Sequence, residues 1–182
     1  IENQLVGKQF DSLVKLYLKE TTKRLLHSLG FGKWKINETN SQFKERMIYK
    51  SIGYHQFNMY AFAMLKESVP DHPFWKSSEF RRLVDFLVSD EFKNGISDNI
   101  YGYPYNPPGF EVPYALSVLN DLTINKLVDI SSWWVNEQFK RCYNPETRMM
   151  DRNTEDPLTH TARVYELARL PISILKRIEV DI

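Results

Sequence analysis

Two histidines, a glutamate and an arginine are the side chains of this sequence best suited to acid–base chemistry. His55, Glu111 and His160 stand at or near the start of predicted helical segments, and Arg163 follows His160 by one helical turn. Imidazole titrates near neutral pH, so the two histidines could serve as acid and base across a bound substrate. Glu111 suits the first turn of a helix electrostatically, and Arg163 could hold an anionic group. We take these four as candidate catalytic residues.

Each candidate also has an ordinary structural interpretation. Either histidine could be a buried ring satisfied by a neighbouring group. Arg163 could form an ion pair with Glu111 or Glu166. Asp156, followed by Pro157, is better suited to capping a helix than to acting as an acid.

Aromatic residues indicate which ligand such a site would take. Phe, Tyr and Trp make up 14% of the chain, and core packing accounts for most of them. The loop at 101–105 (YGYPY) carries three tyrosines, whose rings and hydroxyls could stack on and hydrogen-bond to a sugar. Helix N-termini favour oxygen-rich ligands in the same place. The candidate substrate-binding residues are Tyr54, Tyr103, Tyr105, Phe110 and Asp156.

A recurring segment would bring the candidates together. Residues 53–65, 109–119 and 160–170 align on Tyr60, Tyr114 and Tyr165, with His55, Gly109 and His160 at equivalent earlier positions. A helical repeat of about 50 residues predicts stacked helical hairpins.

The other elements follow from apolar spacing and from helix stop signals. Helices are predicted over 10–29, 74–92 and 122–141, and a short one in the tail from Ile172. Another helix is predicted to begin at about Phe110, with Pro113 near its first turn. No alternating strand pattern persists, so the chain is predicted to be all-α, built of antiparallel helical hairpins. Apolar repeated helices and more charged partners favour the inner and outer layers of a partial (α/α) toroid. We expect one domain over 1–182, whole or part of a larger barrel.

Composition excludes several other classes of protein. The net charge of +1 gives no sign of the basic surface that nucleic-acid-binding proteins carry. No apolar run approaches the roughly 20 residues of a membrane span. No leader pattern follows Ile1, so a cytoplasmic location is expected, although the missing initial Met suggests a fragment or a processed chain. A single cysteine, Cys142, excludes an internal disulfide framework. No metal-binding pair or phosphate loop occurs, so neither metal nor cofactor is expected.

Three segments of this sequence resemble a known family. Residues 108–115 (PGFEVPYA), 156–166 (DPLTHTARVYE) and 54–57 (YHQF) resemble the segments PGHxxEWAW, NPHMHLxEAxLALYE and YDHAF of the N-acylglucosamine 2-epimerase family. The resemblance extends to the wider six-hairpin superfamily of toroidal carbohydrate-active enzymes. It implies an (α/α)6 barrel that isomerises or epimerises sugars, with histidines moving the proton at C2. His160 matches a motif histidine, and His55 is the second candidate.

We therefore expect an acid–base site for a sugar or oligosaccharide at the mouth of a toroid. One alternative is a glycoside hydrolase of the same fold that uses Glu111 and Asp156, whose carboxyl separation would set the stereochemical outcome. Another is a non-catalytic helical repeat that binds a protein partner. Six hairpins need roughly 300 residues. A ring would therefore require a larger chain or a homodimer, and an open array is the remaining arrangement.

Overall fold

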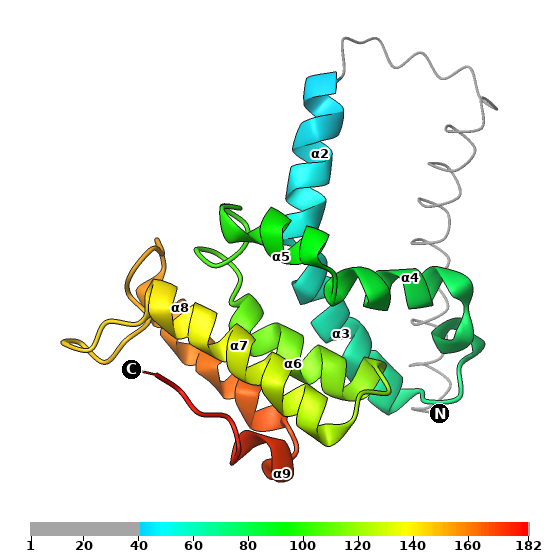
Figure 1. Cartoon of the computed structure of the whole chain (residues 1–182). Coiled ribbons are helices and arrows are strands. Elements are labelled where there is room, and N and C mark those ends of the chain that lie inside the picture. The colour runs from blue at the N-terminus through cyan, green and yellow to red at the C-terminus, as the bar shows by residue number, and fades with distance from the viewer. Residues whose placement is uncertain (1–40, 182) are drawn as a thin grey trace, which may run out of the picture. The chain divides into compact units, whose positions relative to one another are not determined.

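The structure is a computed structural model that describes residues 41–181, with side chains from residue 43 onward (Figure 1). The chain divides into two units, Ile1–Phe43 and Lys44–Ile182, and nearly everything described below belongs to the second. The helix predicted over 10–29 lies outside the described residues.

The regular elements of the described part are helical, and no strand occurs among residues 41–181. An isolated antiparallel bridge joins Asn144 to Met149. This confirms the all-α prediction. In chain order the elements are α2 (Ser41–Gly53), α3 (His55–Ser68), η1 (Pro73–Lys76), α4 (Ser78–Leu87), α5 (Asp90–Ser97), α6 (Pro108–Leu119), α7 (Ile124–Cys142), α8 (Pro157–Ala162), η2 (Arg163–Arg169) and α9 (Ile172–Leu175).

The first hairpin pairs α3 with α4 in antiparallel fashion. His55, at the start of α3, contacts Leu83 and Phe86 near the end of α4, whereas Phe62, later in α3, packs on Phe80 near the start of α4. Two ends of such a pair can meet in this order only if the helices run in opposite directions. α3 ends at Ser68, shortly before Pro70 and Pro73.

The single helix predicted over 74–92 is wrong, because serine caps divide this region into three helices. The Ser77 hydroxyl accepts a hydrogen bond from the Phe80 N–H and begins α4, and the Ser89 hydroxyl accepts from Phe92 and begins α5. A serine side chain in this position satisfies a free N–H of the first turn. α5 runs on to Ser97, past the predicted end of the helix at residue 92.

The second hairpin pairs α6 with α7 so closely that only glycine fits at the contact. A Cβ on Gly109 would lie 2.3 Å from the Gln138 Cβ and 2.5 Å from the Trp134 carbonyl oxygen. Gly109 is near the start of α6 and Gln138 near the end of α7, so these helices are also antiparallel. α6 begins at Pro108, two residues before the predicted start, so Pro113 lies in its second turn.

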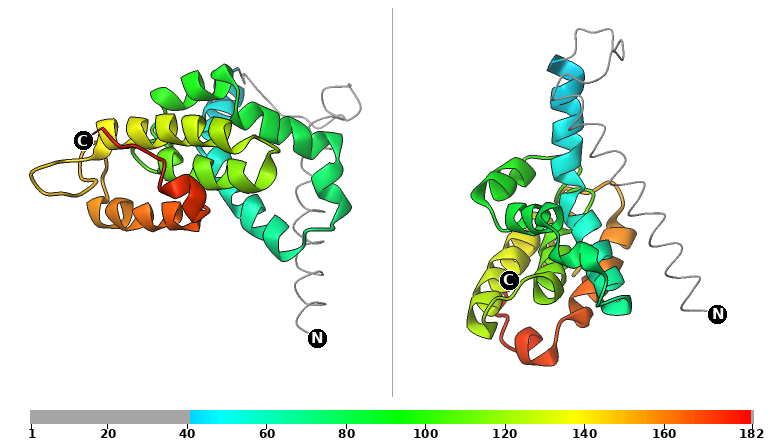
Figure 2. Two further views of the ribbon diagram at one scale, coloured as in Figure 1. Left: turned by 60° about the horizontal axis from the view of Figure 1, so that its bottom comes forward. Right: turned by 90° about the vertical axis from the view of Figure 1, so that its right-hand side faces the viewer.

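Three segments run parallel and in register, as the sequence repeat predicts. Asn106, before α6, donates to the Gly53 carbonyl, before α3, while at the other end Lys66 donates to the Val118 carbonyl. On the other side of α6, Arg163 pairs with Glu111 at the start of η2, and Arg169 lies over the Tyr114 ring at its end. Figure 2 shows α3, α6 and the α8–η2 segment from two further directions.

The third copy of the repeat departs from the other two. The Tyr60 and Tyr114 rings are buried and 5.0 Å apart, whereas Tyr165 is 61% exposed, and its segment continues as the 3-10 helix η2. The most enclosed helix is α6, which packs against α3, α7 and η2. Within residues 53–65 only Phe57 and Asn58 are exposed, and the other residues are buried or half-buried.

Candidate functional site

Arg163 is the centre of a polar cluster where the three parallel segments meet. Its Nη2 forms an ion pair with Oε1 of Glu111 on α6, and its Nε donates to Oε1 of Glu166 at 2.8 Å. Its Nη1 donates to Oδ1 of Asn106 at 3.4 Å. Both ion pairs that the sequence left as alternatives are therefore present, on one guanidinium group.

Burial makes the two carboxyl groups of this cluster unusual. Glu111 is fully buried, Glu166 is 3% exposed, and Oε2 of each has no hydrogen-bond partner among the described residues. Burial raises the pKa of Glu111 to about 8, although the attraction of Arg163 opposes that rise. Burial also raises the pKa of Glu166, again opposed by Arg163. The negative charge of Glu166 also raises the pKa of Glu111, so the protonated form of Glu111 is favoured at neutral pH.

A groove of about 460 Å³ between α3 and the α8–η2 segment reaches this cluster. Its lining combines exposed aromatic rings with the charged groups of Arg163 and Glu166. The lining residues are Phe57, Tyr60, Ala61, Met64, Thr159, Ala162, Arg163, Tyr165 and Glu166.

The rim and the floor of the groove differ in chemistry. Phe57 on α3 is 44% exposed, and the Arg163 guanidinium lies 5.8 Å from the centre of its ring. Tyr165 on η2 presents the second exposed ring. A cation beneath the face of an aromatic ring is attracted by the ring quadrupole, which helps to fix Arg163 below the groove.

His160 adjoins the cluster but is held in its neutral form. It is 3% exposed, and its Nε2 lies 2.9 Å from Nε2 of Gln138. Burial, reinforced by the charge of Arg163, lowers the pKa of His160 to about 4. An imidazole with this pKa is neutral at pH 7, so it cannot act there as a cationic acid.

The structure places His55 on a different face of α3. Its Nε2–H donates to the Leu83 carbonyl at 3.0 Å, and its ring packs on Phe86 and Phe92. Burial lowers its pKa to about 4. No hydrogen bond or ring contact joins His55 to His160 in the described part of the chain. The structural alternative, a buried histidine satisfied by a neighbour, matches these contacts.

Two of the predicted binding tyrosines lie together on the surface. Tyr54, Tyr101 and Tyr105 form one ring cluster, with centroid separations of 5.3 Å for Tyr54–Tyr101 and 5.9 Å for Tyr54–Tyr105. Lys50 lies over the rings of Tyr54 and Tyr101. Tyr105 is the most exposed member, at 62%.

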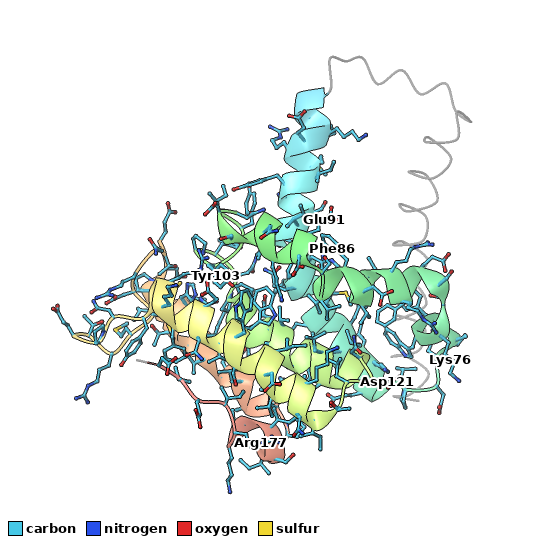
Figure 3. All side chains as sticks on the ribbon, viewed as in Figure 1. Lys76, Phe86, Glu91, Tyr103, Asp121 and Arg177 are labelled. Atoms are coloured by element: carbon cyan, nitrogen blue, oxygen red, sulfur yellow. The ribbon has the colours of Figure 1, made fainter. Side chains whose placement is uncertain are left out.

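The remaining predicted binding residues do not join that cluster. Tyr103, which is labelled in Figure 3, is buried. Its ring stacks on Trp134 of α7, and the Arg141 guanidinium lies over it. Phe110 is fully buried against Phe139, so it offers no surface to a ligand in this structure.

The structural alternative for Asp156 is confirmed. This exposed residue caps α8, and its Oδ1 accepts a hydrogen bond from the Thr159 N–H. The hydrogen bonds to Thr159 lower the pKa of this carboxyl group below its usual range.

Sequence reasoning did not place four side chains of this region among the candidate residues: Glu166, Phe57, Tyr165 and Gln138. Tyr165 was noted only as part of the repeat. Glu166 was noted only as an ion-pair partner, although its spacing from Arg163 places both on one helix face. Phe57 was noted only as the last residue of the segment 54–57 (YHQF). Gln138 gave no signal, because only the close packing of α6 on α7 brings it to His160.

Neither a metal site nor a membrane span is found in the described part. No group of three or more His, Cys, Asp or Glu residues between 41 and 181 could hold a metal ion. None of the helices described above is both long and apolar enough to cross a bilayer.

Comparison with known proteins finds one informative relative. Over 127 residues the chain is 39% identical to archaeal glycosylation protein Q of Haloferax volcanii, a match that covers 70% of this chain. The chain spans about a third of that relative's length, since the match covers 33% of it. No family model matches the sequence. No solved structure matches it either. The resemblance to sugar epimerases and to a toroid therefore stays a prediction.

Proposed function

We propose that this chain carries a sugar-binding acid–base site of a protein that acts in glycosylation. The observation that carries the proposal is Arg163, held between two buried carboxyl groups below a groove with exposed aromatic rings. The name of the relative supports the carbohydrate theme. The parallel register of the three segments supports an arrangement of helical hairpins like that of a toroid.

The groove would bind the sugar through its rim and act through its floor. The rings of Phe57 and Tyr165 would stack against the apolar face of a sugar, and Arg163 would donate to a carbonyl or hydroxyl oxygen. Glu166 would exchange a proton with the carbon beside that carbonyl, since burial raises the pKa of this carboxyl group above its ordinary value and makes it a stronger base. Glu111 would hold Arg163 in place from behind.

The proposal departs from the pairing of two histidines. His55 is hydrogen-bonded on the α4 side of α3, so we leave it outside the site. A glycosidase that uses Glu111 and Asp156 has less support, because Asp156 caps α8 while the carboxyl groups that share Arg163 are Glu111 and Glu166.

Binding is tested by thermal-shift titration of the chain with a panel of aldoses, ketoses and N-acetylated sugars. We expect one class to raise the melting temperature, and Phe57→Ala and Tyr165→Ala to abolish that shift. Both rings are partly exposed, so we expect their removal to lower stability by about 1–2 kcal/mol or less, and the melting temperature of each variant without sugar is the reference for its shift. Trp133→Ala is the matched control, because Trp133 is 42% exposed but lies on α7, outside the groove.

Chemistry is tested by incubating the bound sugar with the chain in deuterium oxide and following its C2 proton by NMR. Acid–base isomerisation replaces that proton with deuterium, and Glu166→Gln should prevent the exchange while sugar binding persists. A reducing end released from a disaccharide would indicate hydrolysis instead. Loss of the thermal shift with Trp133→Ala but not with Phe57→Ala would refute the groove, and no response to any sugar would favour a protein-binding repeat.

A further inference from the structure

The side chain of Gln138 links two parts of the molecule that are far apart in sequence. It is fully buried on α7, between the first turn of α6 and His160 of α8. Its Oε1 accepts a hydrogen bond from the Gly109 N–H at 3.2 Å. Its Nε2 lies 2.9 Å from His160 Nε2 and 3.3 Å from the Cys142 sulfur.

The partners of Gln138 fix which end of its amide faces which neighbour. The backbone N–H of Gly109 can only donate, so the atom facing it must be the amide oxygen. The amide nitrogen therefore faces His160, and because this nitrogen only donates, His160 Nε2 must accept. An accepting ring nitrogen carries no proton.

The thiol of Cys142 supports the same direction. Its sulfur lies 3.6 Å from the Tyr103 carbonyl oxygen, which can only accept, so the S–H donates there. The sulfur is then free to accept the second N–H of Gln138. Burial raises the pKa of Cys142 to about 11, which keeps the thiol protonated for this role.

We propose that Gln138 is a positioning residue that holds His160 as the neutral tautomer protonated at Nδ1. With Nε2 occupied by the amide, Nδ1 is the remaining polar atom of the ring, and it is buried with no hydrogen-bond partner among the described residues. In this tautomer Nε2 accepts from the amide and Nδ1 carries the proton, so the ring has no lone pair free to remove a proton from a ligand. The tautomer does not depend on the proposed sugar site.

The charges around His160 favour the neutral ring. Arg163 lowers the pKa of His160, Asp156 raises it, and burial is the largest influence. Glu111, on α6, is paired with Arg163, and Cys142, on α7, is an uncharged thiol. We therefore expect one tautomer to persist from about pH 5 upward.

The test is NMR of the full chain labelled with nitrogen-15 in its histidine rings, recorded without ligand at pH 7. The protonated and unprotonated ring nitrogens of a neutral imidazole resonate in separate regions, and His160→Gln identifies the signals of His160. His55 is an internal control of the opposite kind, because its Nε2–H donates to a carbonyl. We expect His160 to be protonated at Nδ1 and His55 at Nε2. A proton on Nε2 of His160 would overturn the proposal.

Two variants show whether Gln138 is the cause. Gln138→Glu places a carboxylate that accepts from both neighbours, so the proton should move to Nε2 and the pKa of His160 should rise, with His55 unchanged. Gln138→Met keeps the length but removes the amide, and should give a mixture of tautomers. If His160 keeps its single Nδ1–H signal in folded Gln138→Met, another group sets the tautomer. If neither variant folds, the wild-type spectrum still decides, and since no sugar is added, failure of the sugar titrations leaves this result intact.

Discussion

Removing the guanidinium of Arg163 should destabilise the chain far more than removing a comparable surface arginine. In Arg163→Met, two buried carboxyl groups lose their shared cation, since the side chains of Glu111 and Glu166 are 0% and 4% exposed. Breaking a buried ion pair by removal of one partner costs about 3–5 kcal/mol. The loss should be largest near pH 8 and smaller near pH 5, where the two carboxyl groups can take up protons.

Arg141→Met is the matched control. Arg141 pairs with Glu137 on the same helix and donates to Ser97, but its side chain is 31% exposed. A part-exposed pair contributes about 0–1 kcal/mol and each further hydrogen bond about 1 kcal/mol, so we expect a loss of roughly 1–3 kcal/mol with little dependence on pH.

The assay is urea unfolding followed by circular dichroism at pH 5 and pH 8, with the slope m compared between variants. A double-mutant cycle with Glu111→Gln isolates the coupling, and we expect Arg163→Met to cost at least about 1 kcal/mol less in the Glu111→Gln background. The reasoning fails if Arg163→Met costs no more than Arg141→Met at pH 8, or if its cost is the same in both backgrounds.

Two further predictions concern pH and close packing. Because the pKa of Glu111 is raised to about 8 in the folded chain from an ordinary value of 4.5, its proton binds the folded state more tightly. Stability should therefore fall as pH rises from 4.5 through 8, and Glu111→Gln should flatten this slope in urea unfolding at pH 5, 7 and 9. Gly109→Ala should lower the free energy of unfolding by about 1–3 kcal/mol, because its Cβ would lie 2.5 Å from a backbone oxygen of α7. Gly95→Ala should be within about 1 kcal/mol of wild type, because it meets a flexible isoleucine side chain and gains helix propensity; equal losses would contradict the packing argument.

Some expectations from the sequence rested on local signals, and the structure agrees with these. Asp156 before Pro157 predicts a helix cap, and the structure has that cap. Recurrence of the tyrosine-containing segment predicted three parallel segments, and the contacts of Asn106, Lys66 and Arg163 match that register. The break of the 74–92 helix was also encoded locally, in Ser77 and Ser89, but serine is common enough within helices that its capping role is hard to recognise from sequence.

The sequence by itself determined that the chain is helical, where several helices begin and end, and which charged residues share a helix face. These properties depend on neighbours within a few residues. Only the tertiary structure decided which titratable groups meet. The pKa of Glu111 is raised mainly by its complete burial. The tautomer of His160 is set by the amide of Gln138 on α7, a helix that packs closely on α6 because residue 109 is glycine. Burial and long-range hydrogen bonds depend on how helices pack, and no local pattern of residues specifies that packing.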